Sequence, residues 1–440
     1  MSMSKNKLQI VTLGCSKNQV DSEHILAQVR DDYDIIPEGE DKDVDVLVLN
    51  TCGFIGDAKE ESIQAILEAT ERKKAGKIKK ILVCGCLSQR YMADMPKLIP
   101  EVDGWYGARD IEPIVKALGS KMHHDRRNER VIPGKKLPYA FLKISEGCDR
   151  RCSYCAIPFI RGAHRSVPME DLVEEAKSLA ATGVKELVII AQDTTYYGLD
   201  LYHRRALAEL LQKLSEIEGI EWIRIHYSYP ADFPEDVLEQ MADNPKVCRY
   251  MDIPLQHVSD NILDMMHRHV DGAWTRALIR KMREKVPGIV LRTTMIVGHP
   301  GEGEKEFEEL MEFVREAKFE RLGAFTYSEE EGTFDAENFE DSVPQEIKEE
   351  RLQKLMAEQR EISLAFNKTR VGTETRVLVD DFNDGVFVCR SEFESPEVDG
   401  EILVHYDPAK TSLKPEDIVG TFINVKIVQA DEYDLVGEII

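Results

Sequence analysis

Apolar and polar positions along the first 120 residues alternate between two periodicities. Runs rich in β-branched residues, typical of strands, occupy Leu8–Leu13, Val44–Leu49 and Ile81–Val83. Between them, the stretches 21–30 and 57–70 have helical character, and the second carries apolar residues at helical spacing. This order predicts an open α/β domain with a parallel sheet over residues 1–120.

A polar linker is predicted over residues 121–138, with Pro133-Gly134 as a breaker. From residue 139 to residue 370 the alternation resumes and ends in a long charged helix over Gln345–Lys368. Strand-like runs occupy 140–144, 186–191, 222–226, 250–253, 290–296 and 322–325. Six strand–helix units predict a partial (β/α)6 barrel, whose functional site lies at the carboxyl ends of its strands.

The last 70 residues, 371–440, change to short strands separated by turns such as Asn383-Asp384-Gly385. Strands are expected at 375–379, 386–389, 401–404 and 422–427. This pattern predicts a small antiparallel β-barrel.

The charge balance indicates which class of partner suits the protein. The chain has a formal net charge of −24, and from Val371 onward five Lys and Arg stand against sixteen Asp and Glu. An acidic surface suits a basic partner better than nucleic acid, although such a surface can also serve only solubility. Because no run of about 18 apolar residues occurs and the polar start lacks signal-peptide anatomy, we expect a cytoplasmic protein without a membrane span.

Three closely spaced thiols, Cys148, Cys152 and Cys155, follow the first strand of the predicted barrel. A structural zinc site needs four ligands, usually as two paired knuckles, and no second knuckle follows. Electron-transfer iron–sulfur clusters also use four cysteines. Three ligands therefore favour a cluster with one iron left open, and this spacing resembles the signature of the radical S-adenosylmethionine (SAM) superfamily.

Three further cysteines, Cys15, Cys52 and Cys86, each follow an apolar run and stand beside a glycine. The ends of successive parallel strands converge on one edge of a sheet, so these thiols can meet despite their separation in sequence. A lone cysteine after a strand is more often a small core residue. On spacing alone, packed thiols and a second three-cysteine cluster are both open. For Cys84, Cys248 and Cys389 we expect packing roles.

The whole chain resembles the methylthiotransferase family. The resemblance rests on GCSKNQVDSE, NTCGFI, GCLSQRY, LKISEGCDRRCSYCAIPFIRG, AQDTTYYG, IPLQHVSD, RTTMIVGHPGE and TYSEEEGT, which occur in the family's order. It implies a carboxy-terminal TRAM barrel, SAM and two 4Fe–4S clusters. One cluster, on Cys148, Cys152 and Cys155, would cleave SAM to a 5′-deoxyadenosyl radical. The auxiliary cluster, on Cys15, Cys52 and Cys86, would present the sulfur.

The resemblance also implies contacts to SAM. Tyr154 would pack against adenine, and Gln192 and Asp193 would receive the methionyl ammonium. The remaining expected contacts are Gln256 to the ribose, and Val297 and Gly298 to adenine. His299 and Gly303 depart from the family pattern, which has an aromatic residue and a threonine there.

Within the family, the segments 13–18 and 142–147 resemble the enzymes that modify an aspartate of the twelfth small-subunit ribosomal protein. The resemblance implies hydrogen removal from the β-carbon, with an electron donor such as flavodoxin. We expect the acidic terminal barrel to bind this basic protein through two neighbouring groups, Asp380–Asp384 and Asp431–Asp434. The alternatives are a tRNA adenosine methylthiotransferase and, in a different class, a non-catalytic iron–sulfur electron-transfer protein.

Overall fold

The computed structural model describes residues 5–40, 42–408 and 414–440. The chain forms two compact units. The amino-terminal unit comprises residues 1–136, 141–149 and 155–179, and the carboxy-terminal unit comprises 137–140, 150–154 and 180–440. Over the described residues, no helix combines the length and the apolar character that crossing a membrane requires.

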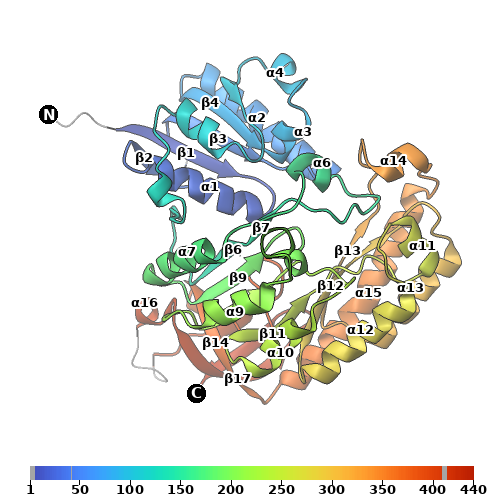
Figure 1. Ribbon diagram of the computed structural model, residues 1–440. Helices are drawn as coiled ribbons and strands as arrows, with labels where there is room; N and C mark the ends of the chain where they lie inside the picture. The colour runs from blue at the N-terminus through green and yellow to red at the C-terminus, as the bar shows by residue number, and fades with distance from the viewer. Residues whose placement is uncertain (1–4, 41, 409–413) are drawn as a thin grey trace. The chain divides into compact units, whose positions relative to one another are not determined.

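A five-stranded parallel sheet organises the amino-terminal unit, in the order β2-β1-β3-β4-β5 (Figure 1). Its strands are β1 (Asn6–Thr12), β2 (Tyr33–Ile36), β3 (Val44–Thr51), β4 (Ile78–Gly85) and β5 (Gly104–Trp105). Its helices are α1 (Ser16–Val29), α2 (Gly56–Lys74), α3 (Cys86–Arg90), α4 (Met95–Leu98) and α5 (Ile111–Ala117), with a 3-10 turn at His124–Arg126. The predicted parallel α/β domain is confirmed.

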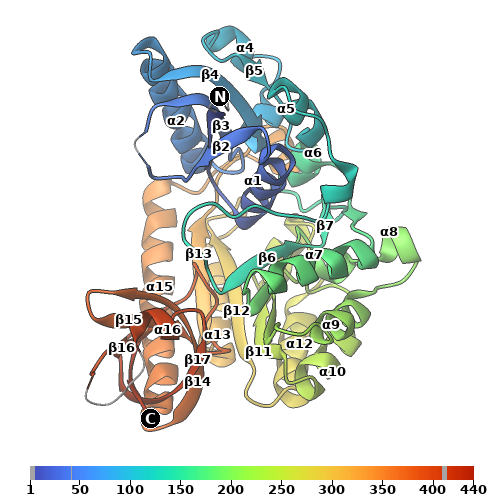
Figure 2. The same cartoon turned by 90° about the vertical axis from the view of Figure 1, so that its left-hand side faces the viewer.

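Alternate residues of the strands face opposite helical layers, which explains the continuous apolar runs. On one face, Leu8, Val48 and Leu82 pack with apolar residues of α1 and α5. On the other face, Leu49 and Val83 pack with α2 and with the segment after α3. Figure 2 shows α2 on one side of the sheet and α1 and α5 on the other. Both faces are therefore covered, and the carboxyl edge of the sheet is left for chemistry.

The second sheet has six strands in the order β13-β12-β11-β10-β9-β6 and does not close. Its strands are β6 (Tyr139–Lys143), β9 (Glu186–Ile190), β10 (Trp222–Ile225), β11 (Val247–Asp252), β12 (Val290–Val297) and β13 (Arg321–Thr326). The larger helices are α7 (Met169–Ala181), α9 (Leu207–Ser215), α10 (Glu235–Asp243), α12 (Gly272–Lys285), α13 (Glu304–Ala317) and α15 (Gln345–Arg370). Shorter elements are β7 (Ser145–Glu146), β8 (Arg165–Ser166), α6 (Ile157–Arg161), α8 (Leu199–Tyr202), α11 (Asp260–Met265) and α14 (Phe334–Asn338), with a 3-10 turn at Thr194–Tyr196. This is the predicted partial barrel.

A closed five-stranded barrel ends the chain, in the order β14-β15-β16-β18-β17. Its elements are β14 (Glu374–Asn383), β15 (Val386–Arg390), β16 (Ile402–His405), α16 (Pro415–Ile418), β17 (Phe422–Ala430) and β18 (Leu435–Ile439). The sequence pattern did not predict β18. Gly437 interrupts its apolar pattern. A Cβ at that position would lie within about 3.4 Å of Ile402, Val404 and Val425, so the barrel interior leaves little room for a side chain there.

One sequence-based expectation about this barrel is wrong. The two acidic groups do not lie on neighbouring loops, because β14 runs antiparallel to β17 and pairs Leu378 with Phe422. The turn that ends β14 and the turn that ends β17 therefore lie at opposite ends of the barrel. Asp380 is also withdrawn from the surface, since its carboxylate accepts two hydrogen bonds from the buried Arg390.

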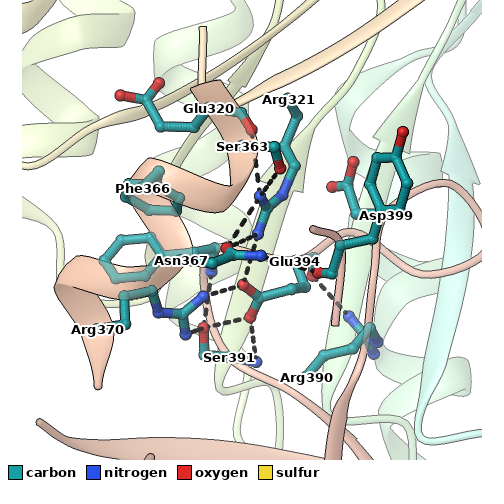
Figure 3. Close-up of polar contacts among 12 residues, drawn as sticks. Glu320, Arg321, Ser363, Phe366, Asn367, Arg370, Arg390, Ser391, Glu394 and Asp399 are labelled. Atoms are coloured by element: carbon teal, nitrogen blue, oxygen red, sulfur yellow. Dashed lines mark hydrogen bonds and ion pairs between the residues drawn. The ribbon is translucent and has the colours of Figure 1, made fainter. Parts of the chain in front are cut away.

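Buried ion pairs connect the terminal barrel to α15 and β13 (Figure 3). Glu394 is buried and its carboxylate pairs with Arg370 and, at 3.1 Å, with Arg321. Asn367 of α15 donates through Nδ2 to the carbonyls of Asp431, Glu432 and Tyr433 at 2.9–3.3 Å. The turn between β17 and β18 is therefore fixed to α15.

Replacing Glu394 with Gln should strongly destabilise the carboxy-terminal unit, because two buried guanidinium groups would lose their anion. The expected loss is about 3–5 kcal/mol in the free energy of unfolding, measured by urea denaturation. The control is Glu392→Gln, a half-buried neighbour, with an expected change of about 0.5 kcal/mol. A loss for Glu394→Gln no larger than that of the control would contradict the network's importance.

The stability difference between wild type and Glu394→Gln should depend on pH in a defined way. Burial alone would raise the pKa of the Glu394 carboxyl, but Arg370 and Arg321 hold the pKa at about 2. A lowered pKa stabilises the fold fully above the ordinary carboxyl pKa of about 4.3 and less as pH falls toward 2. The stability difference between wild type and Glu394→Gln should therefore be constant above about pH 5 and shrink below it.

Candidate functional site

The loops that carry Cys15, Cys52 and Cys86 meet at the carboxyl edge of the first sheet. A Cβ added to Gly14 would lie 2.6 Å from the Cβ and 2.8 Å from the Sγ of Cys52. One added to Gly53 would lie 2.8 Å from the carbonyl carbon of Cys86. The glycines beside the cysteines are thus required by the close approach of the loops.

Two asparagines fix these loops to one another. Asn18, in the first turn of α1, donates through Nδ2 to the carbonyls of Leu13 at 2.8 Å and Thr51 at 3.2 Å. Asn50, near the end of β3, donates to the carbonyl of Asn18 at 2.8 Å. The two side-chain amides therefore hold the loops of Cys15 and Cys52 together through backbone carbonyls.

The three thiols differ in exposure. Cys52 and Cys86 are buried and Cys15 is half-buried. Burial raises the pKa of the Cys86 thiol to about 11, and Arg161 opposes that rise. Cys86 also packs with Ala156 and Ile160, so α3 lies against the segment that follows Cys155. Deprotonated thiolates here need a positive charge, which a metal centre and Arg161 would both supply.

Across the described ranges, no three His, Cys, Asp or Glu side chains are grouped tightly enough to share one metal ion. A zinc ion with Zn–S bonds of about 2.3 Å would hold its sulfurs roughly 3.8 Å apart. A 4Fe–4S cluster instead binds each cysteine through a different iron and holds the sulfurs farther apart. Thiolates on three converging loops are the kind of ligand that an iron–sulfur cluster uses.

The second cysteine group occupies the loop between β7 and β8, which pair through Ser145 with Ser166 and Glu146 with Arg165. At its base, the Cys148 amide donates to the carbonyl of Gly162 at 3.1 Å. Cys148, Cys152 and Cys155 are all half-buried. A loop that is closed at its base and carries three half-buried cysteines fits a cluster that must meet a diffusible cofactor.

Arg268 of the carboxy-terminal unit contacts this motif, and sequence reasoning missed it. Its Nη1 lies 3.3 Å from the Sγ of Cys152 and 3.4 Å from the Tyr154 hydroxyl. Arg268 is buried, and its guanidinium lies 4.3 Å from the ring centre of Tyr229. No sequence pattern marks Arg268 as part of a site. It stands between His267 and His269, which both adopt positive φ.

The residues expected to bind SAM lie beyond the carboxyl ends of the barrel strands. Gln192 and Asp193 follow β9, and Val297 and Gly298 stand at the end of β12. The Asp193 carboxylate accepts from Arg150 Nε at 2.7 Å and from Thr195, and the Val297 carbonyl accepts from the Tyr327 amide. Neither observation tests the expected contacts, which stay predictions.

Gln256 offers the clearest sign of a ligand site. Its backbone has φ of +72° and bridges to Met295, which brings the residue back to the sheet after β11. Its Oε1 is buried and finds no hydrogen-bond partner among the residues that the structure describes. A buried amide oxygen without a partner costs free energy unless a ligand group donates to it, as a ribose hydroxyl would.

His299 takes the place of the expected aromatic residue without leaving a gap. The ring is buried, lies 5.1 Å from the Tyr327 ring and has Nε2 2.8 Å from the Asp335 carboxylate. Asp335 in turn donates its amide to the carbonyl of Ser153, inside the cysteine motif. His299 therefore stabilises the cysteine motif indirectly, through Asp335.

The remaining cysteines are packed, as expected. Cys84, Cys248 and Cys389 are buried in three separate apolar clusters. Burial raises the pKa of the Cys248 thiol to about 12 and raises those of the other two further. Buried thiols with raised pKa values are poor nucleophiles, so packing accounts for all three.

Three known families match successive parts of the chain. Residues 142–314 match the Radical SAM superfamily, residues 371–440 match the TRAM domain, and residues 7–107 match the uncharacterized protein family UPF0004. The chain is 49% identical to the ribosomal protein uS12 methylthiotransferase RimO of Bacteroides fragilis over 439 residues, which covers 100% of both chains. The chain belongs to the RimO family. The predicted family resemblance is confirmed.

Other RimO-family relatives agree. The RimO proteins of Porphyromonas gingivalis and Christiangramia forsetii are each 49% identical to this chain, over 100% and 95% of their own lengths. Among solved structures, the radical SAM methyltransferase TsrM of Kitasatospora setae, with cobalamin and a [4Fe-4S] cluster bound, has a TM-score of 0.54. It is 12% identical, over 88% of this chain and 81% of that one, so the likeness concerns the fold alone. This RimO-family chain is a radical-SAM enzyme, and the electron-transfer alternative is set aside.

Proposed function

We propose that this chain transfers a methylthio group to an aspartate β-carbon of ribosomal protein uS12, with two 4Fe–4S clusters and SAM. The observation that carries the proposal is the convergence of the Cys15, Cys52 and Cys86 loops in a chain that also holds the Cys148, Cys152 and Cys155 motif. One cluster would suffice to cleave SAM. A second set of three cysteines supplies a separate place for the sulfur.

The residues of the motif loop have distinct roles. Cys148, Cys152 and Cys155 would bind the first cluster and leave one iron open. When bound, the first cluster supplies a carbon-centred radical from SAM, and the auxiliary cluster supplies the methylthio group. Arg268 donates a charge-assisted hydrogen bond to the Cys152 sulfur and orients the Tyr154 ring from its hydroxyl side.

The walls of the SAM site come from the carboxy-terminal unit. Gln256 Oε1, which has no hydrogen-bond partner among the described residues, would accept a hydrogen bond from a ribose hydroxyl. Gln192 and Asp193 would receive the methionyl ammonium, with Arg150 beside Asp193 available to the carboxylate of SAM. The Arg150 guanidinium carbon lies 4.1 Å from the centre of the Tyr229 ring, and this cation–π contact limits the motion of the side chain. Val297 and Gly298 would line the adenine.

The auxiliary site would use the remaining three thiols. Cys52 and Cys86 are buried, and Cys15 is half-buried. A buried site protects bound sulfur from water, while the half-buried side admits the substrate. Cys86 packs on Ala156, the residue after Cys155, so the amino-terminal unit brings parts of both cysteine groups side by side.

The substrate assignment rests on the full-length RimO relatives and on charge. An acidic protein repels the phosphates of tRNA and attracts a lysine- and arginine-rich ribosomal protein. A ribosomal substrate also implies work in the cytoplasm, with a small electron donor such as flavodoxin. The direct test offers purified uS12 or tRNA to the reconstituted enzyme and SAM under anaerobic conditions. Mass spectrometry should find methylthio addition on uS12 alone, and addition on tRNA alone would overturn the substrate assignment.

We further propose that uS12 docks on the turn between β17 and β18. Asp431 and Asp434 are exposed there, and the turn is held rigid by Asn367. Reversing Asp431 and Glu432 to Lys should slow association with uS12 by roughly tenfold at low salt, because rim charges act on the association rate. The difference should shrink at high salt, as measured by stopped-flow fluorescence.

The matched control for docking reverses Asp381 and Asp384 at the opposite end of the barrel. That variant changes the net charge of the chain by the same amount. Equal slowing in both variants would mean that net charge, and not the β17–β18 turn, governs association. No slowing in the Asp431 and Glu432 variant would place docking elsewhere.

A further inference from the structure

Arg161 makes its contacts within the amino-terminal unit to a cysteine loop and to the residues that surround it. It is the last residue of α6 and is 2% exposed. Its Nε lies 3.3 Å from the Sγ of Cys86. Its Nη1 donates to the carboxylates of Asp21 at 2.8 Å and Glu146 at 3.0 Å, and its Nη2 donates to Asn18 Oδ1. Each nitrogen of the guanidinium therefore has an acceptor.

The carboxylates that hold Arg161 are neutralised from the other side by Lys143. Its Nζ pairs with Asp21 and, at 2.8 Å, with Glu146. Two cations and two anions thus balance, with Arg161 on the side of the Cys86 sulfur. Removing Arg161 would leave a net negative charge next to that sulfur.

Asn18 also fixes the geometry of the contact. Its Nδ2 donates to carbonyls in the loops of Cys15 and Cys52, so its Oδ1 is turned toward Arg161. The guanidinium is therefore oriented by the same residue that joins two of the cysteine loops. An arginine needed only to link α1 with α6 would not require its Nε to face a sulfur.

We infer that Arg161 is a positioning residue for the auxiliary cluster, which holds a charge-assisted hydrogen bond on the Cys86 sulfur and raises the cluster's reduction potential. The inference rests on the proposed function, because it requires a cluster on Cys15, Cys52 and Cys86. Reduction adds negative charge to an iron–sulfur cluster, and hydrogen bonds and cations at the sulfurs stabilise the reduced form. Arg161 supplies both from a desolvated position, where they act most strongly.

The test isolates the auxiliary cluster in a full-length Cys148→Ala, Cys152→Ala, Cys155→Ala background. The reduction potential is measured by electron paramagnetic resonance during a redox titration. At the midpoint potential of the background protein, Arg161→Gln should lower the ratio of reduced to oxidised cluster about tenfold. For a one-electron couple, this means a reduction potential that is lower by about 59 mV. Arg161→Lys keeps the charge but cannot serve both the carboxylates and the sulfur, so a smaller shift in the same direction is expected.

The matched control is Arg130→Gln. Arg130 has an equally buried side chain in the same unit and pairs with the carboxylates of Glu23 of α1 and, at 3.2 Å, Glu175. These hydrogen bonds go to oxygen atoms and not to sulfur. Both Gln variants should lose thermal stability, but only Arg161→Gln should shift the potential. Unchanged potentials in both Arg161 variants, or an equal shift in Arg130→Gln, would overturn the inference. If Arg161→Gln does not fold, Arg161→Lys decides by the same criterion. If the background binds no iron, the two-cluster proposal itself fails, and the inference fails with it.

Discussion

Cys152→Ala should abolish the formation of 5′-deoxyadenosine in anaerobically reconstituted protein while leaving the second cluster in place. The Cys152 sulfur is one of the three ligands proposed for this cluster, so its loss should disable the cluster and not merely its surroundings. The fall in 5′-deoxyadenosine should therefore exceed the roughly 10–100-fold that the loss of an outer-shell partner costs. Product is measured by liquid chromatography after reduction with dithionite in the presence of SAM.

The control for this variant is Cys248→Ala. Cys248 lies in the same unit, but it is buried in an apolar cluster with Trp222, Tyr250 and Leu378. Its removal should change stability slightly and leave SAM cleavage as it is in wild type. Undiminished 5′-deoxyadenosine in Cys152→Ala would show that the motif does not bind the SAM-cleaving cluster.

The second large effect concerns the auxiliary site. Replacing Cys15, Cys52 and Cys86 together with Ala should halve the iron content of reconstituted protein, because each 4Fe–4S cluster contributes about half of the total. The variant should still cleave SAM by reduction, since the thiols of the motif remain. Methylthio transfer to uS12 should disappear, because the sulfur source is lost. Iron is determined by colorimetry against protein concentration.

Cys84→Ala is the matched control for iron content. Cys84 lies two residues from Cys86 and is buried in the core beside α1 and α5. Its replacement should leave both iron and sulfide at the wild-type level. If the triple variant retained as much iron as wild type, the chain would hold only one cluster, and the sulfur would have to come from another source.

The sequence predicted the fold well wherever the signal was local. The apolar runs of β1, β3 and β4 and of the six barrel strands could be read directly, because both faces of a parallel sheet are buried. Strands β2 and β5 were missed because they are short, and β18 was missed because Gly437 breaks its pattern where three side chains crowd the barrel interior. Packing, and not propensity, decides these elements.

The cysteines of the candidate site could be predicted, but the charged residues around them could not. Each cysteine stands after a strand and beside a glycine or in a tight motif, which the sequence displays. Arg161 contacts Asp21 across 140 residues and Arg268 contacts Cys152 across 116. No local pattern distinguishes these arginines from surface ones. The acidic groups of the terminal barrel were misplaced for a related reason, since strand pairing, and not sequence proximity, sets which turns are neighbours.

Hydrogen transfer from uS12 tests the central claim most directly. uS12 carrying deuterium at the β-carbon of its aspartates is incubated anaerobically with the reconstituted enzyme, SAM and a reductant, beside a parallel reaction with tRNA. Mass spectrometry should find deuterium in 5′-deoxyadenosine and a methylthio group on one aspartate of the same uS12 molecules, if the proposed function is right. Methylthio addition to tRNA, or modified uS12 with no deuterium in 5′-deoxyadenosine, would contradict it.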